Sequence, residues 1–248
     1  MTRLRAANLA LAAIHGLQAV LIVVLGAALV IPITAQWADG PPGSELLPPE
    51  TLFDLSVRWA VAAFLLMAAL DHLLVASPRV VGWYERNLGR GVNYARWTEY
   101  SFSASLMVVL IATFAGITDL RALVAVAGVN AAMILFGLLM ERSNLGRGRD
   151  ELDWLPFWFG CIAGAVPWIV IGVSLVGAEI DGSVPGFVWG IFLSLFLFFN
   201  SFAVNMWLQY KGIGPWRSYV FGEWGYLVLS LTAKSALAWQ IYSGALAS

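Results

Sequence analysis

Seven apolar stretches, each long enough to cross a lipid bilayer as a helix, divide this chain from end to end. A helix rises about 1.5 Å per residue, so about 20 apolar residues span a hydrocarbon core of about 30 Å. Only 12% of the 248 residues are charged, against about a quarter in soluble domains. The sequence therefore predicts an all-α membrane protein, a bundle of seven transmembrane helices in one domain over residues 1–248. The expected helices cover roughly residues 6–31, 55–77, 93–115, 119–142, 154–178, 184–211 and 220–246.

Targeting and cysteine patterns narrow the class further. The first run is longer than the apolar core of a signal peptide, and residues 32–36 form a poor cleavage site, so we expect no cleavage there. The single cysteine, Cys161, excludes an internal disulfide and is expected to be a small core residue. The net charge of −1 gives no sign of nucleic-acid binding.

The basic residues predict the orientation of the helices in the membrane. Cytoplasmic ends of membrane helices carry an excess of lysine and arginine. About eleven of the 14 basic residues lie on one side, before the first run and around the links after the second, fourth and sixth runs. The other side has only Arg58 and Arg121. The sequence therefore predicts a cytoplasmic N-terminus and an extracellular C-terminus.

The links between the runs differ in length. The first link is the longest, at about 24 residues, and it contains Asp39-Gly-Pro-Pro-Gly43. Such a segment favours defined turns, which leaves open a structured external flap at a dimer contact or a plain solvated loop. The link around residues 116–119 is so short that the third and fourth helices are expected to be antiparallel neighbours.

Lys234, about 14 residues into the last run, is the most costly residue in the predicted bundle. A lysine at the centre of a membrane helix costs roughly 2.5–3.5 kcal/mol on insertion scales. Its ammonium group is stable there only with a buried partner, a water cavity or conversion to an imine. Glu99, in the third run, is the one carboxylate that we expect to lie deep enough to pair with it.

The other polar residues within the runs gather on the cytoplasmic side of the lysine. Towards the opposite side, residues 106–114 are almost entirely apolar and contain no second carboxylate. The sequence thus predicts a polar cavity open towards the cytoplasm and a dry plug outside it. By helix rise the deeper polar residues fall at roughly 8–14 Å; they are His15, His72 and Glu99, with Asn93, Arg96 and Glu141 on the same side.

Several functions fit a pair of Lys234 and Glu99. It could be a structural ion pair, a coupling site for a proton or another ion in a transporter, or an imine with its counterion. Ser103 and Ser230 lie one turn from Glu99 and Lys234, so each can bond to its charged neighbour or to its own backbone. Asp71 adjoins His72 on a different helix face and is expected to point elsewhere. The histidines lack metal-ligand spacing, so no metal site is expected.

Aromatic residues crowd the fifth and sixth runs. They suit either the walls of a slot for a flat conjugated ligand or ordinary packing and interfacial anchoring. Met133 and Gly137 share a face of the fourth run, where the glycine leaves room for a ring. The aromatic residues are Trp154, Trp158, Trp168, Phe192, Phe196, Phe198, Phe199 and Phe202.

Five stretches, spread over nearly the whole chain, resemble one family. The sequence is similar to the heliorhodopsins, microbial rhodopsins of inverted topology. This resemblance implies a rhodopsin-type bundle with a small extracellular β element between the first two helices. The matching stretches are Arg96-Trp-Thr-Glu-Tyr-Ser101, Gly128-Val-Asn130, Leu155-Pro-Phe-Trp-Phe-Gly-Cys-Ile-Ala-Gly164, Ser194-Leu-Phe-Leu-Phe-Phe-Asn-Ser-Phe202 and Ala233-Lys-Ser-Ala-Leu-Ala-Trp-Gln240.

The same resemblance implies a cofactor and its site: all-trans retinal bound to Lys234, with Glu99 as the counterion. Two positions depart from the family: Ala68, where a serine is expected, and Asp71, where an apolar residue is expected. The chromophore pocket would comprise Tyr100, Ser103, Met133, Gly137, Phe199 and Ser230. The cytoplasmic polar cavity would comprise His15, His72, Asn93, Asn130 and Glu141.

The resemblance further implies a light sensor, not an enzyme, with a slow photocycle and no ion pumping. It would form a homodimer in the bilayer and signal to an unidentified cytoplasmic partner. A light-driven proton or ion transporter is the alternative, although it would need polar groups on both sides of Lys234. A retinal-free transporter that uses Lys234 and Glu99 as a coupling pair is a third hypothesis.

Overall fold

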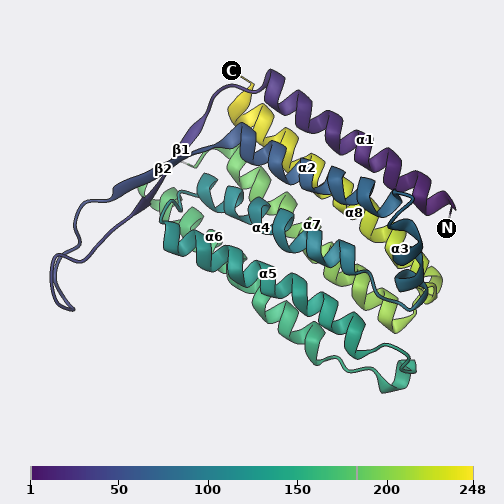
Figure 1. Ribbon diagram of the computed structural model, residues 1–248. Helices are drawn as coiled ribbons and strands as arrows, with labels where there is room; N and C mark the ends of the chain where they lie inside the picture. The colour runs from purple at the N-terminus through teal and green to yellow at the C-terminus, as the bar shows by residue number, and fades with distance from the viewer. Residues whose placement is uncertain (1, 183, 248) are drawn as a thin grey trace.

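The protein is a bundle of long helices with a two-stranded arm at one end (Figure 1). The computed structural model describes residues 2–182 and 184–247. The two termini lie at opposite ends of the bundle (Figure 1), as an odd number of crossings requires. The long helices are α1 (Thr2–Leu25), α2 (Val57–Ala76), α4 (Tyr94–Phe114), α5 (Leu120–Ser143), α6 (Leu155–Asp181), α7 (Gly186–Lys211) and α8 (Tyr219–Ile241).

Each predicted apolar run becomes one of these helices, which confirms the seven-helix bundle. The largest boundary difference is at the first run, where α1 ends at Leu25 and residues 30–35 form a strand instead. Gly26 follows the helix directly, and the next residues are rich in β-branched side chains, which favour extended structure. Apolar length alone could not reveal this change from helix to strand.

Six helices in the described ranges are long and apolar enough to cross a membrane, and α8 is not among them. The reason is that α8 contains several polar residues, and these residues face the bundle interior. Glu223, Ser230 and Lys234 are all buried, while α8 packs against α7 and α1. Polar groups on the inner side of a membrane helix mark a functional site by default.

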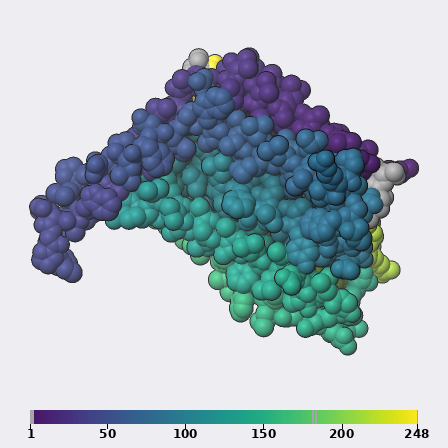
Figure 2. Space-filling model, in the orientation of Figure 1, coloured from purple at the N-terminus to yellow at the C-terminus, as the bar shows by residue number. Residues whose placement is uncertain are grey.

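The long first link forms an antiparallel hairpin rather than a plain solvated loop. Strand β1 (Val30–Ala35) pairs with β2 (Glu50–Ser56), with a bulge between Ile33 and Thr34. The Thr34 amide donates to the Thr118 carbonyl at 2.9 Å, which fixes the base of the hairpin to the short α4–α5 link. Its tip projects beyond the bundle as an arm (Figure 2).

The second link contains a short helix, where the sequence predicts only a connection between two transmembrane runs. Helix α3 (Val81–Gly89) buries Tyr84 and Leu88 in a small apolar cluster with Leu4, Leu11 and Val75. It thereby covers the end of the bundle where α1 begins and α2 ends.

Large apolar side chains also cover the outside of the bundle. Leu17, Leu70 and Val173 are 61%, 64% and 69% exposed, which is the surface expected of helices that face lipid. The interior core joins all seven long helices through residues such as Ile22, Phe64 and Leu237. Both faces of most helices are therefore apolar, for different reasons.

Candidate functional site

Lys234 and Glu99 lie in contact at the middle of the bundle. The Lys234 Nζ donates to Glu99 Oε2 and to Ser230 Oγ, both at 3.1 Å. The two charged side chains are 4% and 6% exposed. Ser230 precedes Lys234 by one turn of α8, which puts its hydroxyl beside the amine. The predicted pairing across α4 and α8 is therefore present in the structure.

The pair has unused hydrogen-bonding capacity. Among the described residues, Glu99 Oε1 and Ser103 Oγ are buried without a partner. The Lys234 Nζ also lies 4.8 Å above the centre of the Tyr100 ring. Because buried polar atoms are nearly always satisfied, these open positions suit a site that takes up another group or water.

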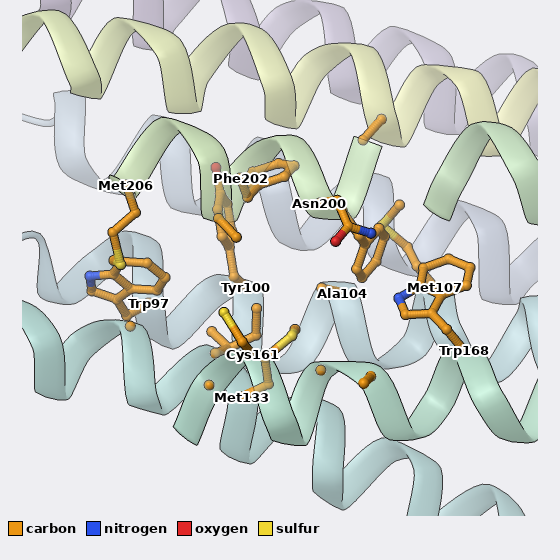
Figure 3. A pocket seen from close by; sticks show the side chains of 18 of the residues that line it. Trp97, Tyr100, Ala104, Met107, Met133, Cys161, Trp168, Asn200, Phe202 and Met206 are labelled. Carbon is orange, nitrogen blue, oxygen red and sulfur yellow. The ribbon is translucent and has the colours of Figure 1, made fainter. Parts of the chain in front are cut away.

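An apolar cavity of about 310 Å³ begins at Lys234. Its volume is within the range of small-molecule sites. Figure 3 shows Trp97 and Met206 towards one end and Met107 and Trp168 towards the other, with Tyr100 between them. Trp97 and Met107 are ten residues apart on α4, or about 15 Å by helix rise. The cavity therefore suits a long, flat, apolar ligand.

The cavity collects most of the residues that were predicted to line it. Tyr100, Met133, Gly137, Phe199 and Ser230 are all on its wall. Ser103 is fully buried, but it is not among the lining residues.

Two glycines give the cavity its shape. A Cβ at Gly137 would collide with the Trp97 ring, and a Cβ at Gly164 would lie 2.6 Å from the Met133 sulfur. A larger residue at either position would displace Trp97 or Met133, both of which line the cavity. The prediction that Gly137 makes room for a ring thus has a specific form: the ring it accommodates is that of Trp97.

One wall of the cavity reaches the outer surface between α6 and α7. Cys161, Phe196 and Asn200 line the cavity and are exposed. The prediction of a core position for Cys161 is therefore wrong, because an apolar run gives no sign of which helix face meets lipid. Trp168 of α6 contacts Phe196 and Phe199 of α7 edge to face, so aromatic rings close part of this gap.

A second buried charge cluster lies one turn from Glu99 along α4. Arg96 pairs with Glu141 of α5 at 2.5 Å and with Glu223 of α8. Glu141 accepts three further hydrogen bonds, and Glu223 accepts one from the Asn93 side chain at 2.7 Å. The other donors to Glu141 are the Asn93 amide, the Trp97 indole and the Tyr219 hydroxyl, at 2.9, 2.6 and 3.0 Å.

Glu223 is a buried carboxylate that was not predicted from the sequence, where Glu99 is expected to be the one deep acid. A signal was available, because Glu223 precedes Lys234 by eleven residues, or about three helical turns. The two residues therefore share one face of α8, and a polar face of that length indicates an inner position.

The two histidines form a pair of their own. Their rings stack with centroids 5.8 Å apart. The His72 Nδ1 lies 2.7 Å from Asn8 Oδ1, and the Asn8 amide nitrogen donates to the Leu4 carbonyl. His72 Nδ1 therefore donates, which leaves its Nε2 as an acceptor. Both nitrogens of His15 are buried without a partner in the described part of the chain.

A small polar cavity, of about 20 Å³, lies between His72 and the Arg96–Glu223 pair, and a space of that size holds about one water molecule. Asp71 lines it, so the expectation that this acid points away from His72 is wrong. Asp71 and His72 are adjacent on α2 and both line this cavity, which is also lined by residues of α1, α3, α4 and α8. Its wall includes Asn8, Asp71, His72, Tyr84, Asn93, Arg96, Tyr100, Glu223 and Tyr226.

Asn130 lies apart from this polar cavity. Its side chain donates to Ser105 Oγ at 3.1 Å, and Asn130 is not among the residues that line the polar cavity. Asn130 lies ten residues into α5, near mid-helix, so it does not join His72 and Asn93 on the wall of this cavity, and Glu141 and His15 are not on that wall either. Asn130 instead joins α4 to α5.

Comparisons with known proteins agree with this architecture. The family described as Heliorhodopsin matches residues 4–246. Among curated proteins, none matches the sequence significantly. Among solved structures, the chain is similar to the light-driven proton pump LR (Mac) from Leptosphaeria maculans, with a TM-score of 0.65. The match covers 97% of this chain and 95% of that chain at 15% identity, so it bears on the fold alone.

Proposed function

This chain belongs to the heliorhodopsin family of retinal-binding, light-sensing membrane proteins, and from that premise we propose that it is a photoreceptor with all-trans retinal bound covalently to Lys234. The family is one of photoreceptors and not of enzymes. The observation that carries the proposal is the Lys234 amine at the wall of a long apolar cavity, 3.1 Å from a buried carboxylate. When bound, retinal supplies absorption of visible light and a change of shape on illumination.

The residues around Lys234 fit a protonated Schiff base at its nitrogen. Glu99 supplies the negative charge that keeps such a nitrogen protonated, and Ser230 accepts a hydrogen bond from it. Tyr100, Met133 and Phe199 would flank the chain of the ligand, since all three are on the cavity wall. No charge other than Lys234 lines that cavity among the described residues, which favours an uncharged conjugated ligand.

The polar groups on one side of Lys234 support an exchange of protons without net transport. The polar cavity and the histidine pair lie on the side where Arg96 and Glu223 are buried. On the other side, Val108, Leu110 and Ile111 of α4 are at most 1% exposed and offer no acceptor. We propose that a proton leaves the nitrogen and returns to it from the same side, in a slow photocycle.

We also propose the orientation and the partners of the protein. The excess of basic residues supports a cytoplasmic N-terminus and a polar cavity in the cytoplasmic half of the membrane. A homodimer through the hairpin fits the exposed apolar residues on the projecting arm (Figure 2): Leu46, Leu47, Leu52 and Phe53. The light signal would then pass to a separate cytoplasmic protein.

The test is reconstitution of the expressed protein with retinal. We expect a visible absorption band that hydroxylamine bleaches under illumination. The Lys234→Ala variant should lack the band, whereas the Lys211→Ala variant, changed at the end of α7, should keep it. A colourless wild-type protein that is folded would contradict the proposal.

The alternative of a light-driven proton or ion transporter requires a separate measurement. Illumination of cells or vesicles that contain the pigment should produce no pH change sensitive to an uncoupler. A sustained light-dependent pH change would replace the proposed sensor with a pump.

A further inference from the structure

The polar half of the bundle contains more carboxyl groups than cations. With both histidines neutral and every acid ionised, two positive charges would face four negative ones, a net charge of −2. An uncompensated carboxylate in a low-dielectric interior takes up a proton instead of remaining charged. The cations are Arg96 and Lys234, and the acids are Asp71, Glu99, Glu141 and Glu223.

Hydrogen bonds indicate which acid keeps the proton. Glu141 accepts four hydrogen bonds, and Glu223 accepts one from Arg96 and one from Asn93. Glu99 accepts from the Lys234 amine. Every partner of these three acids is a donor, which stabilises the ionised form. The Asp71 side chain has no hydrogen bond or ion pair within residues 2–182 and 184–247.

The surroundings of Asp71 disfavour a charge on it. It is partly buried on α2, in a segment that we place in the membrane. Arg96, the one cation on the polar cavity's wall, is already paired with two glutamates. The titratable groups around the cavity are His72, Tyr84, Arg96, Tyr100, Glu223 and Tyr226.

More distant charges and the tyrosine of α3 do not reverse this balance. Glu99 and Lys234 also act on Asp71 through space, but they are paired with each other and largely cancel. Burial raises the pKa of the Tyr84 hydroxyl, so Tyr84 stays neutral and is a possible hydrogen-bond donor. Asp71 is therefore the acid in this half whose neighbours favour the neutral form most.

We propose that Asp71 is protonated in the resting protein and donates its proton to the Lys234 nitrogen after light has removed the proton held there. This inference rests on the proposed function. In the step, the O–H bond of Asp71 breaks and its electron pair stays on the carboxylate. The lone pair of the nitrogen forms the new N–H bond, with the proton relayed through a water in the polar cavity and past Tyr100, which lines both that cavity and the apolar cavity at Lys234.

The proton that the nitrogen loses after the flash also needs an acceptor. A neutral imidazole of the stacked His15–His72 pair accepts it, because the His15 nitrogens have no other partner in the described residues. That imidazolium then returns the proton to the Asp71 carboxylate. The cycle moves no net proton across the bundle and needs no other reactant.

The test uses Asp71→Asn, which has the shape of the protonated acid and cannot donate its proton. We expect an unchanged dark absorption maximum, because a neutral side chain replaces a neutral one. The infrared C=O band of a protonated carboxylic acid should disappear from the dark spectra of both the retinal-free and the reconstituted protein. After a flash, return of the proton to the nitrogen should slow by about 100-fold, the scale of general acid catalysis.

Further measurements make the test specific. In Asp71→Asn the rate of proton return should become proportional to proton concentration, and a small weak acid such as azide should restore it. Asp71→Glu should return the rate to within a few-fold of wild type. Asp54→Asn, which changes an exposed acid on β2, should alter neither the infrared band nor the rate.

Defined results would overturn the inference. A dark absorption shift in Asp71→Asn with the carboxylic acid band retained would mean that Asp71 is ionised at rest. Slower loss of the proton, with unchanged return, would make Asp71 the acceptor. In both cases the pigment and the proposed function survive, whereas a wild-type protein that forms no pigment removes both. If Asp71→Asn does not fold, the comparison of wild type with Asp71→Glu decides. A carboxylic acid C=O band that changes position between these two proteins belongs to residue 71, and an unchanged band contradicts the inference.

Discussion

Two buried ion clusters join α4 to α8, and they are built in opposite ways. At one, Arg96 of α4 meets Glu223 of α8 and Glu141 of α5, and the two acids together accept six hydrogen bonds. At the other, Glu99 of α4 meets Lys234 of α8, and one carboxylate oxygen has no partner in the described chain. The signs of charge are reversed between the two contacts.

This difference separates a structural role from a chemical one. A buried charge that is saturated with donors has little freedom to change its protonation. A sparse pair beside a cavity can change partners, gain a covalent group or lose a proton at a lower cost. The reversed signs also fix the register of α4 against α8, since a shift along either helix would place like charges together.

The cluster of Arg96, Glu141 and Glu223 is called the saturated cluster below, and the pair of Lys234 and Glu99 is called the sparse pair. The largest effect should come from removing Arg96, the cation of the saturated cluster. Arg96→Met would leave two buried glutamates without their shared cation. Breaking a buried pair in this way costs about 3–5 kcal/mol. We expect a marked fall in the thermal unfolding temperature of the detergent-solubilised protein.

Arg121→Gln provides the control for that experiment. Arg121 pairs with Asp119 at the surface, where its side chain is 61% exposed. Exposed pairs contribute about 0–1 kcal/mol, so its loss should change the unfolding temperature little. Equal losses in the two variants would contradict a special role for the buried cluster.

The next effect distinguishes the two clusters by the absorption maximum of the pigment. Glu99→Gln removes the negative charge nearest the proposed protonated nitrogen. That charge stabilises the ground state of the pigment more than its excited state, so its loss narrows the energy gap and the absorption band should move strongly to the red. Glu223→Gln should move it little, because the charge of Glu223 is offset by Arg96. Absorption spectra of the two reconstituted variants check this, and an unmoved band in Glu99→Gln would remove Glu99 as the counterion.

A third, smaller effect concerns the link between the saturated cluster and the apolar cavity. The Trp97 indole donates to Glu141 at 2.6 Å while its ring covers Gly137. Gly137→Ala should displace this ring, at a cost of about 1–3 kcal/mol for overpacking, and reduce retinal uptake. Thermal unfolding and the extent of pigment formation are the measurements.

Gly128→Ala is the matched control on the same helix. A Cβ at Gly128 has no atom within 4 Å, and alanine is the better helix former. This variant should therefore be neutral or slightly more stable. A loss of pigment there as large as that in Gly137→Ala would assign the effect to α5 in general.

The sequence predicted the sparse pair but not the saturated cluster, for a geometric reason. Counting residues from the helix ends gives the depth of a side chain, which sufficed to match Glu99 with Lys234. It does not show how neighbouring helices enclose a residue, and so Asp71 and His72, on different faces of α2, were not expected to share a cavity wall. Glu223 lies near a helix end, where acids are usually solvated, so counting residues from the helix ends does not single it out.

The fold was predicted more completely than the site because apolar length is a strong signal in membranes. The same signal is uninformative about helix faces, since lipid and core both favour apolar side chains. This explains the error at Cys161, which lies on the outer surface of α6. It also explains the first run, whose last apolar residues leave α1 and form β1.

The smallest effect should come from removing one hydrogen bond at each cluster and comparing the two losses. Ser230→Ala removes an acceptor from the Lys234 nitrogen, which has few other partners. Tyr219→Phe removes one of the four donors to Glu141. A hydrogen bond to a charged group contributes about 1.5–3 kcal/mol, and about 1.4 kcal/mol corresponds to one pH unit.

For Ser230→Ala the sign follows from which form the bond stabilises. The hydroxyl accepts from the protonated nitrogen, so its loss favours the neutral nitrogen. In a titration of the dark pigment, the transition to the short-wavelength, deprotonated form should begin about one pH unit lower than in wild type. Tyr219→Phe should leave this titration unchanged, because three donors to Glu141 remain. A shift of equal size in both variants would mean that the two clusters respond as one unit, and the contrast between them would be lost.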